Sequence, residues 1–180
     1  MLFRSPEPVI PSADDLLYHS VLLKIGSHAA VVDGGVTAIY PGEKTVTAYA
    51  HDGRTYIPVR FVAERLGATV GWENETETVT IRKGNQTIRM SVGELWYTDN
   101  GVRKEMDVPA EYMASTDGNS RTMVPVRFVT EALGFQVEWD YPRQMVVIGK
   151  PDYRWEMNHE NAEDALNQAN MLLLFYSSFV

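Results

Sequence analysis

The sequence predicts an α+β protein with two tandem repeats, each a small antiparallel β-sheet with one short helix packed on it, followed by a C-terminal helix. Three observations predict this class. The segment that begins at Arg54 recurs 67 residues later, beginning at Arg121. Apolar and polar residues alternate around it, and 44% of the 180 residues are hydrophobic. That length suits one domain or two small ones.

The recurring segment organises the chain. Residues 54–67 read RTYIPVRFVAERLG and residues 121–134 read RTMVPVRFVTEALG, and the same offset continues on both sides without insertion or deletion. We therefore expect two units of one fold related by pseudo-symmetry. The expected divisions are an extended lead-in, repeat 1, repeat 2 and a helical, apolar tail, over residues 1–19, 20–86, 87–152 and 153–180.

Each repeat begins with two predicted strands, and a less regular third strand follows them. The first two strands are expected over residues 21–25 and 29–32 in repeat 1, and over 87–92 and 95–98 in repeat 2. Asp33-Gly34 and Asn100-Gly101 come directly after the second strands. These dipeptides favour a tight turn with positive φ, so an antiparallel arrangement is expected.

A short helix is predicted in each repeat, from Pro58 to Leu66 and from Pro125 to Leu133. Proline is tolerated at the first helical residue, and a glycine follows each helix at the position where a left-handed residue is wanted. A half-buried hairpin comes next. The expected core anchors and the tryptophans packed near them recur in both repeats: Phe61, Phe128, Trp72 and Trp139.

The repeated block resembles the copper amine oxidase N-terminal-like domain family. The motif lies in residues 53–72 and 120–139, where each copy runs from the Arg-Thr pair through Pro-Val-Arg-Phe-Val to a tryptophan. The resemblance covers about residues 21–150. It implies an α+β stalk or accessory module of bacterial secreted and surface proteins, separate from the oxidase and without catalytic residues to carry over.

No copper site or other cofactor is expected. A protein copper site needs several converging imidazoles, whereas the histidines are dispersed and none recurs at the repeat offset. They are His19, His28, His51 and His159. The chain has no cysteine, which excludes disulfides, zinc–thiolate sites and cysteine nucleophiles.

The charge balance excludes one class of partner. The net charge of −8 argues against a nucleic-acid binder, because affinity for phosphates comes mainly from Lys and Arg. No apolar stretch is long enough to span a bilayer. We expect an extracellular or cell-envelope location, although the first residues lack the apolar region of a secretory signal.

Some charged groups could suggest metal binding or catalysis, but a solvated surface or an ion pair explains them more simply. Glu73, Glu75 and Glu77 share a strand face but lack the spacing of a calcium loop, so a solvated face is expected. The pair Arg60 and Glu64 recurs 67 residues later and suits an ion pair between successive helical turns. We therefore expect no catalytic residues and no enzyme activity.

Aromatic residues offer candidates for a glycan contact. Trp72 and Trp139 recur at matched positions, which favours a core role over stacking on sugar rings. The non-recurring aromatics are the better candidates for a glycan contact: Trp96, Tyr97 and Trp155.

The tail is expected to form a helix over residues 162–180. Its alanines permit close approach, and its large apolar residues extend all round the helix after Met171. We expect it to dock on another surface, with a second chain or partner protein favoured. Packing on the repeats themselves and addition of a strand to a neighbouring sheet remain open. The expected partner contacts are Leu166, Leu173, Phe175, Tyr176 and Phe179.

Three functions follow from these features. The favoured one is a non-catalytic extracellular or cell-surface module that binds protein partners or assembles with its own copies into an oligomer or filament. The second is a module that binds cell-wall polysaccharide or another glycan. The third is an enzyme, against which stands the absence of any recurring polar constellation.

Overall fold

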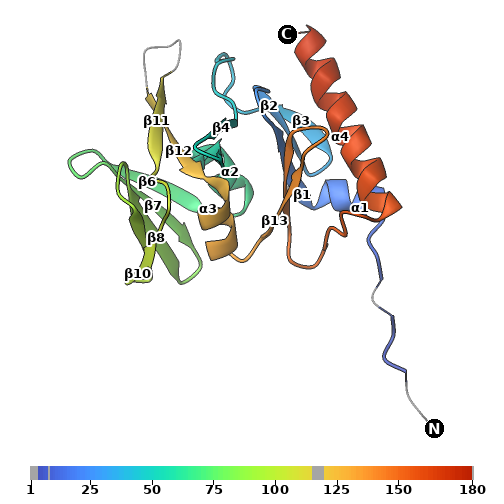
Figure 1. Ribbon diagram of the computed structural model, residues 1–180, viewed down its shortest axis with the longest axis horizontal. Coiled ribbons are helices and arrows are strands. Elements are labelled where there is room, and N and C mark those ends of the chain that lie inside the picture. Colours follow the sequence, from blue (N-terminus) through green and yellow to red (C-terminus); the bar gives the residue numbers. More distant parts are fainter. Residues whose placement is uncertain (1–3, 8, 115–119, 180) are drawn as a thin grey trace.

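The computed structural model describes residues 4–7, 9–114 and 120–179, and it confirms an α+β protein with antiparallel sheets. In this part of the chain the helices are α1 (Ala13–Tyr18), α2 (Val59–Arg65), α3 (Val126–Ala132) and α4 (Glu160–Phe179). Figure 1 shows one sheet at each end of the molecule, a central sheet with α2 and α3 between them, and α4 on the outside.

The three sheets are named here by their surroundings. The helix-covered sheet has the order β13-β14-β1-β2-β3, formed by Gln136–Asp140, Met145–Gly149, Ser20–Lys24, Ala29–Val32 and Gly35–Ala38. The open sheet has the order β10-β9-β8-β7-β6, formed by Val102–Glu105, Trp96–Asp99, Gln86–Ser91, Thr78–Lys83 and Thr69–Glu73. The central sheet has the order β11-β12-β5-β4, formed by Glu111–Ala114, Ser120–Pro125, Arg54–Pro58 and Tyr49–His51.

The outer sheets mix strands from both repeats, which differs from the expectation of one sheet per repeat. The open sheet joins β6 and β7 of repeat 1 to β8, β9 and β10 of repeat 2, and the helix-covered sheet makes the reciprocal exchange. The reason is local. Only two residues separate Lys83 from Gln86. Lys83 and Gln86 pair with each other across this turn, so the last strand of repeat 1 must pair with the first strand of repeat 2.

The central sheet joins the repeats at equivalent positions. Ile57 of β5 lies opposite Val124 of β12, and the two residues are 67 positions apart in the sequence. This antiparallel pair therefore lies on a local pseudo-two-fold axis. Pro58 and Pro125 end these strands and stand at the N-cap positions of α2 and α3, so each helix begins one residue later than predicted.

The offset between the repeats is not constant, which corrects the expectation of an alignment without gaps. Tyr49 of β4 pairs with Tyr56, whereas Glu111 of β11 pairs with Met123, the residue equivalent to Tyr56. Tyr49 is therefore equivalent to Glu111, 62 positions later. A shorter loop before β11 is offset by a longer connection after it, so the 67-residue offset returns at β12.

Two apolar cores hold the fold together. The larger core lies between the three sheets and includes residues of α2 and α3. The smaller core lies on the other face of the helix-covered sheet, where α1 and α4 pack. Phe61 is 6% exposed in the larger core, as predicted, and Phe128 is partly buried against it.

The outer faces of the two outer sheets explain why helices cover only one of them. Leu22 and Val147 face α1 and α4 on the helix-covered sheet, and the equivalent residues of the open sheet are Arg89 and Thr80. Apolar side chains on the outer face require a cover, whereas arginine and threonine are compatible with water. The two repeats therefore share a fold, but only one of the two outer sheets has an outer face that requires helices to cover it.

Trp155 belongs to the smaller core, 1% exposed, and reaches it because strand β14 ends in glycine. A Cβ atom at Gly149 would lie 2.9 Å from the indole ring. The side chain of Gln136 donates to the backbone carbonyl of Trp155 and accepts from its N–H, at 3.0 and 2.9 Å. These contacts hold the segment before α4 against the sheet.

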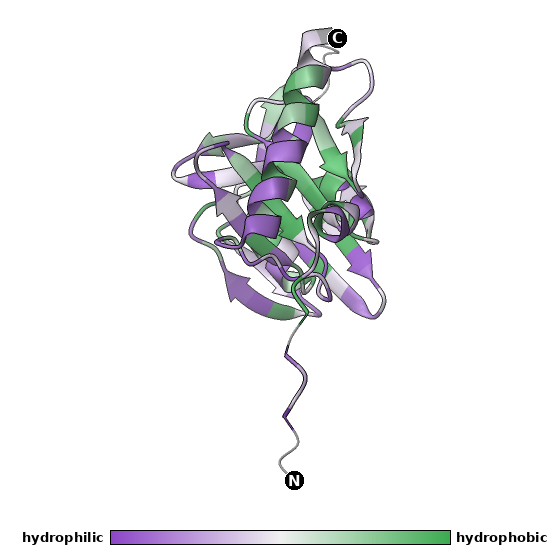
Figure 2. Cartoon of the chain, turned by 90° about the vertical axis from the view of Figure 1, so that its right-hand side faces the viewer, coloured by the Kyte–Doolittle hydropathy of each residue, from purple (hydrophilic) through white to green (hydrophobic). Residues whose placement is uncertain are grey.

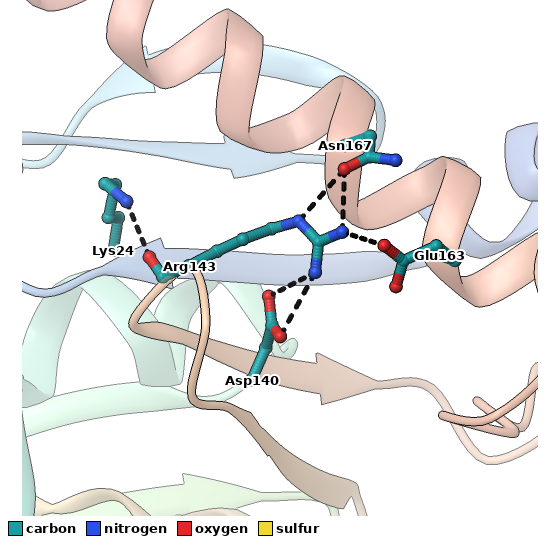
Figure 3. A network of polar contacts seen from close by, with 5 residues as sticks. All are labelled: Lys24, Asp140, Arg143, Glu163 and Asn167. Atoms are coloured by element: carbon teal, nitrogen blue, oxygen red, sulfur yellow. Dashed lines mark hydrogen bonds and ion pairs between the residues drawn. The ribbon is translucent and has the colours of Figure 1, made fainter.

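Arg143, in the turn between β13 and β14, attaches α4 to the sheet (Figure 3). Its Nη1 donates to both oxygens of Asp140 at 3.2 and 3.1 Å, and its Nη2 donates to Oδ1 of Asn167 at 2.7 Å and pairs with Glu163. Lys24 donates to the carbonyl of Arg143. One guanidinium therefore connects the hairpin turn to two successive turns of α4.

Replacing this guanidinium should destabilise the protein strongly. Arg143→Met leaves Asp140, which is 6% exposed, without its cation, and breaking such a pair typically costs about 3–5 kcal/mol of unfolding free energy. Urea unfolding followed by tryptophan fluorescence measures the change. Arg127→Met is the control, because its ion pair with Glu131 is more than half exposed and is worth about 0.5 kcal/mol or less. Equal losses in the two variants would contradict this role for Arg143.

Candidate binding grooves

Two grooves flank the central sheet and are the candidate functional sites. Groove 1 encloses about 800 Å³ between α2, β6 and the strands β11 and β12 of the other repeat. Groove 2 encloses about 700 Å³ between α3, β13 and the strands β4 and β5. Each groove therefore takes one wall from each repeat.

The grooves are equivalent sites of the two repeats. The residues Pro58, Phe61, Glu64 and Trp72 line groove 1, and their equivalents Pro125, Phe128, Glu131 and Trp139 line groove 2. The opposite walls correspond as well, because Tyr112 in groove 1 is equivalent to Ala50 in groove 2 by the strand pairing. The pseudo-symmetry of the two repeats therefore produces two matching grooves.

Groove 1 carries a tryptophan beside a tyrosine. The rings of Trp72 and Tyr112 meet edge to face, with centroids 6.0 Å apart, and Trp72 is 39% exposed. Tyr112 donates to Glu77 at 2.7 Å, which fixes its ring. Burial, and then the hydrogen bond to Glu77, raise the pKa of Tyr112 to about 12, so this hydroxyl stays protonated at neutral pH.

Groove 2 carries the same pair of residue types from different elements. Trp139 meets Tyr141 edge to face at 5.5 Å, but Tyr141 follows β13 in the same repeat, whereas Tyr112 comes from the opposite repeat. Asn74 stands at the position equivalent to Tyr141. Both grooves thus contain a tryptophan flanked by a tyrosine, but the two tyrosines come from different structural elements.

The expected roles of the aromatics are partly reversed. Trp139 packs against the larger core as expected, although it also lines groove 2, whereas Trp72 lines groove 1 and is 39% exposed. Tyr97 is 8% exposed and Trp155 almost fully buried, so neither ring offers a face to a sugar, contrary to the expectation for a glycan contact. Trp96 is half-buried on the outer face of the open sheet, with Arg103 4.9 Å from its ring centroid.

The tail residues divide into two sets. Leu166 and Leu173 are buried in the smaller core, and Tyr176 is packed against it, so within this chain α4 docks on its own sheet. Phe175 is exposed, together with Met171, Leu172 and Leu174. The side chain of Phe179 lies outside the described part of the structure. The expectation that Leu166 and Leu173 contact a partner is therefore corrected. Their face of α4 covers the helix-covered sheet of the same chain.

A polar cluster crosses the central sheet near its pseudo-two-fold axis. Tyr49 donates to Glu111 at 2.6 Å, and Nδ1 of His51 lies 2.9 and 3.0 Å from the two Glu111 oxygens. The described part of the chain places no group of three or more His, Asp or Glu side chains where they could hold a metal ion. Beneath this cluster Tyr56 donates to the carbonyl of Pro109 at 2.7 Å.

Stability should fall in alkaline solution because of this cluster. Burial, reinforced by the charge of Glu111, raises the pKa of Tyr56 to about 12, above its ordinary value near 10. Between these values the unfolded chain loses a proton that the folded chain keeps, so the unfolding free energy should decrease as pH rises from 10 to 12. Urea unfolding over this range should show a smaller decrease for Tyr56→Phe than for Tyr141→Phe, whose ring is exposed. Identical slopes would contradict the assignment.

The fold and its paired grooves define an internally duplicated α+β domain. Comparison with protein-family models matches the copper amine oxidase N-terminal domain over residues 39–148 and 111–174. The chain belongs to this family, whose members are non-catalytic domains. Searches of curated proteins and of solved structures found no match. In the described part of the chain, no helix is both long and apolar enough to cross a bilayer.

Proposed function

We propose that this chain is a non-catalytic binding module of the extracellular space or cell envelope, and that its two grooves hold a polysaccharide. The location follows from the implied role of the family as a module of secreted and surface proteins. The recurrence of a tryptophan flanked by a tyrosine in both grooves carries the ligand assignment. A sugar ring has apolar C–H faces and a polar rim, so it suits an aromatic wall with charged groups around it.

The groove walls fit this ligand. The helical ion pairs Arg60–Glu64 and Arg127–Glu131 stand along the grooves, with N···O distances of 3.3 and 3.1 Å. Their exposed guanidinium and carboxylate groups can exchange hydrogen bonds with hydroxyls at little cost in desolvation. A binding role requires no nucleophile or general base, which agrees with a non-catalytic domain.

Removing the groove tryptophans should abolish polysaccharide binding. The test is affinity electrophoresis through gels that contain soluble neutral polysaccharides, with Trp72→Ala, Trp139→Ala and the double variant. Each lost ring should weaken binding about tenfold, the equivalent of about 1.4 kcal/mol. Trp96→Ala is the matched control, because this ring lies on the open sheet away from both grooves. If the polysaccharide retards the double variant as much as the unchanged chain, the groove assignment is wrong. It is also wrong if only Trp96→Ala loses this retardation.

A second function is favoured by the end of α4. Met171, Leu174 and Phe175 are exposed near the end of the helix, and Figure 2 shows hydrophobic colouring over the turns of α4 shortly before its end. Exposed apolar residues gathered on one helix end are typical of a protein contact. We propose that this strip binds a protein partner and, because every copy presents the same strip, a second copy of the chain in a homo-oligomer.

Light scattering measures this self-association directly. The full chain should exceed the monomer mass at high micromolar concentration, and a triple variant with Met171→Glu, Leu174→Glu and Phe175→Glu should be monomeric. These substitutions leave the buried helix face intact, whereas deletion of the helix would uncover the smaller core. Leu173→Ala serves as a control that lowers stability without changing the strip. A monomeric full chain would contradict self-association.

A further inference from the structure

The two grooves have equivalent walls but different charges. The ion pairs Arg60–Glu64 and Arg127–Glu131 are equivalent and neutral, so they do not distinguish the grooves. The difference comes from three other positions, two of them in the groove walls and one at the rim. Arg65 lines groove 1 and is replaced by Ala132 in repeat 2, whereas Glu138 lines groove 2 and is replaced by Gly71 in repeat 1.

Arg65 presents its charge to groove 1. It is exposed in the last turn of α2, with its guanidinium carbon 4.6 Å from the centroid of the Phe61 ring. The ring attracts the cation without neutralising it, and the described residues give Arg65 no ion pair. Its planar fork therefore remains available to bind a carboxylate through two hydrogen bonds.

The third difference lies at the rim of the grooves. In groove 2, Arg54 pairs with Asp107. In groove 1, the equivalent Arg121 lies 4.2 Å from the ring centroid of Tyr40, the residue equivalent to Asp107. Groove 1 thus has an aromatic ring where groove 2 has a carboxylate.

We infer that groove 1 selects a saccharide that carries carboxylates, such as a polymer of uronic acid, and that Arg65 is its specificity-determining residue. This inference rests on the proposed function. The net charge of the chain is −8, so a polyanion is repelled by most of the surface and can be held only where positive charge is local. Arg65 is exposed, so its attraction for a carboxylate is also screened by salt and is strongest at low ionic strength.

The test compares two polymers with one backbone, polygalacturonate and its neutral methyl ester, by isothermal titration at low and at high salt. The full chain should bind polygalacturonate about tenfold more tightly than the ester at low salt, a preference that falls as salt rises. Arg65→Ala, which installs the residue of repeat 2, should remove the preference, because it weakens binding of polygalacturonate far more than binding of the ester. Trp72→Ala should weaken binding of both polymers.

Arg103→Ala is the matched control for the charge. Arg103 also lies over an aromatic ring, that of Trp96, but on the open sheet, so its removal changes the net charge equally and should leave the preference intact. Loss of the preference in Arg103→Ala as well as in Arg65→Ala would overturn the inference. Equal affinity of the full chain for the two polymers would overturn it too, while leaving the proposed function in place. No binding of either polymer, and none of the neutral polysaccharides, would overturn both.

Discussion

The antiparallel pairing of β5 with β12 positions the rest of the molecule. Each strand leads into a helix at its proline, so the pairing places α2 and α3 on either side of a pseudo-two-fold axis. The hairpin after each helix then extends away from the axis and completes the sheet of the other repeat. Neither repeat can bury its apolar surfaces alone, because the larger core takes residues from both. Folding of one repeat is therefore coupled to folding of the other.

The same exchange creates the grooves. A groove forms where the helix of one repeat faces the strands of its partner, and pseudo-symmetry requires that there be two of them. Residues from distant parts of the sequence meet there, such as Trp72 and Tyr112. Each groove draws on both repeats, but no residue lines both grooves, so a single substitution alters the lining of one groove only.

Much of the local structure could be predicted from the sequence. The Asp33-Gly34 and Asn100-Gly101 turns have the expected positive φ angles, from 48° to 82°, and both helices occur where the repeated motif predicts them. Local rules suffice there, because turn geometry and helix capping depend on a few neighbouring residues. The long-range pairings could not be predicted this way. The short turn after Lys83 accounts for the pairing of β7 with β8, whereas the pairings of β5 with β12 and of β1 with β14 join distant segments and have no local signal.

The site was harder to predict than the fold for the same reason. Recurrence of Trp72 and Trp139 was interpreted as a core signal, yet a duplicated surface site also makes its residues recur. Gly149, which stands where repeat 1 has Arg82, is a better indication of a buried aromatic residue. The loss of a side chain on a covered face indicates that something large packs there, and here it is Trp155.

The compensated difference in loop length has a consequence for comparing the repeats. An ungapped comparison pairs Glu111 with Lys44, whereas the strand pairing makes Glu111 equivalent to Tyr49. The ungapped alignment would therefore compare β11 with residues 44–47, which form no strand. It would pair Tyr112 of groove 1 with Thr45 instead of with Ala50 of groove 2.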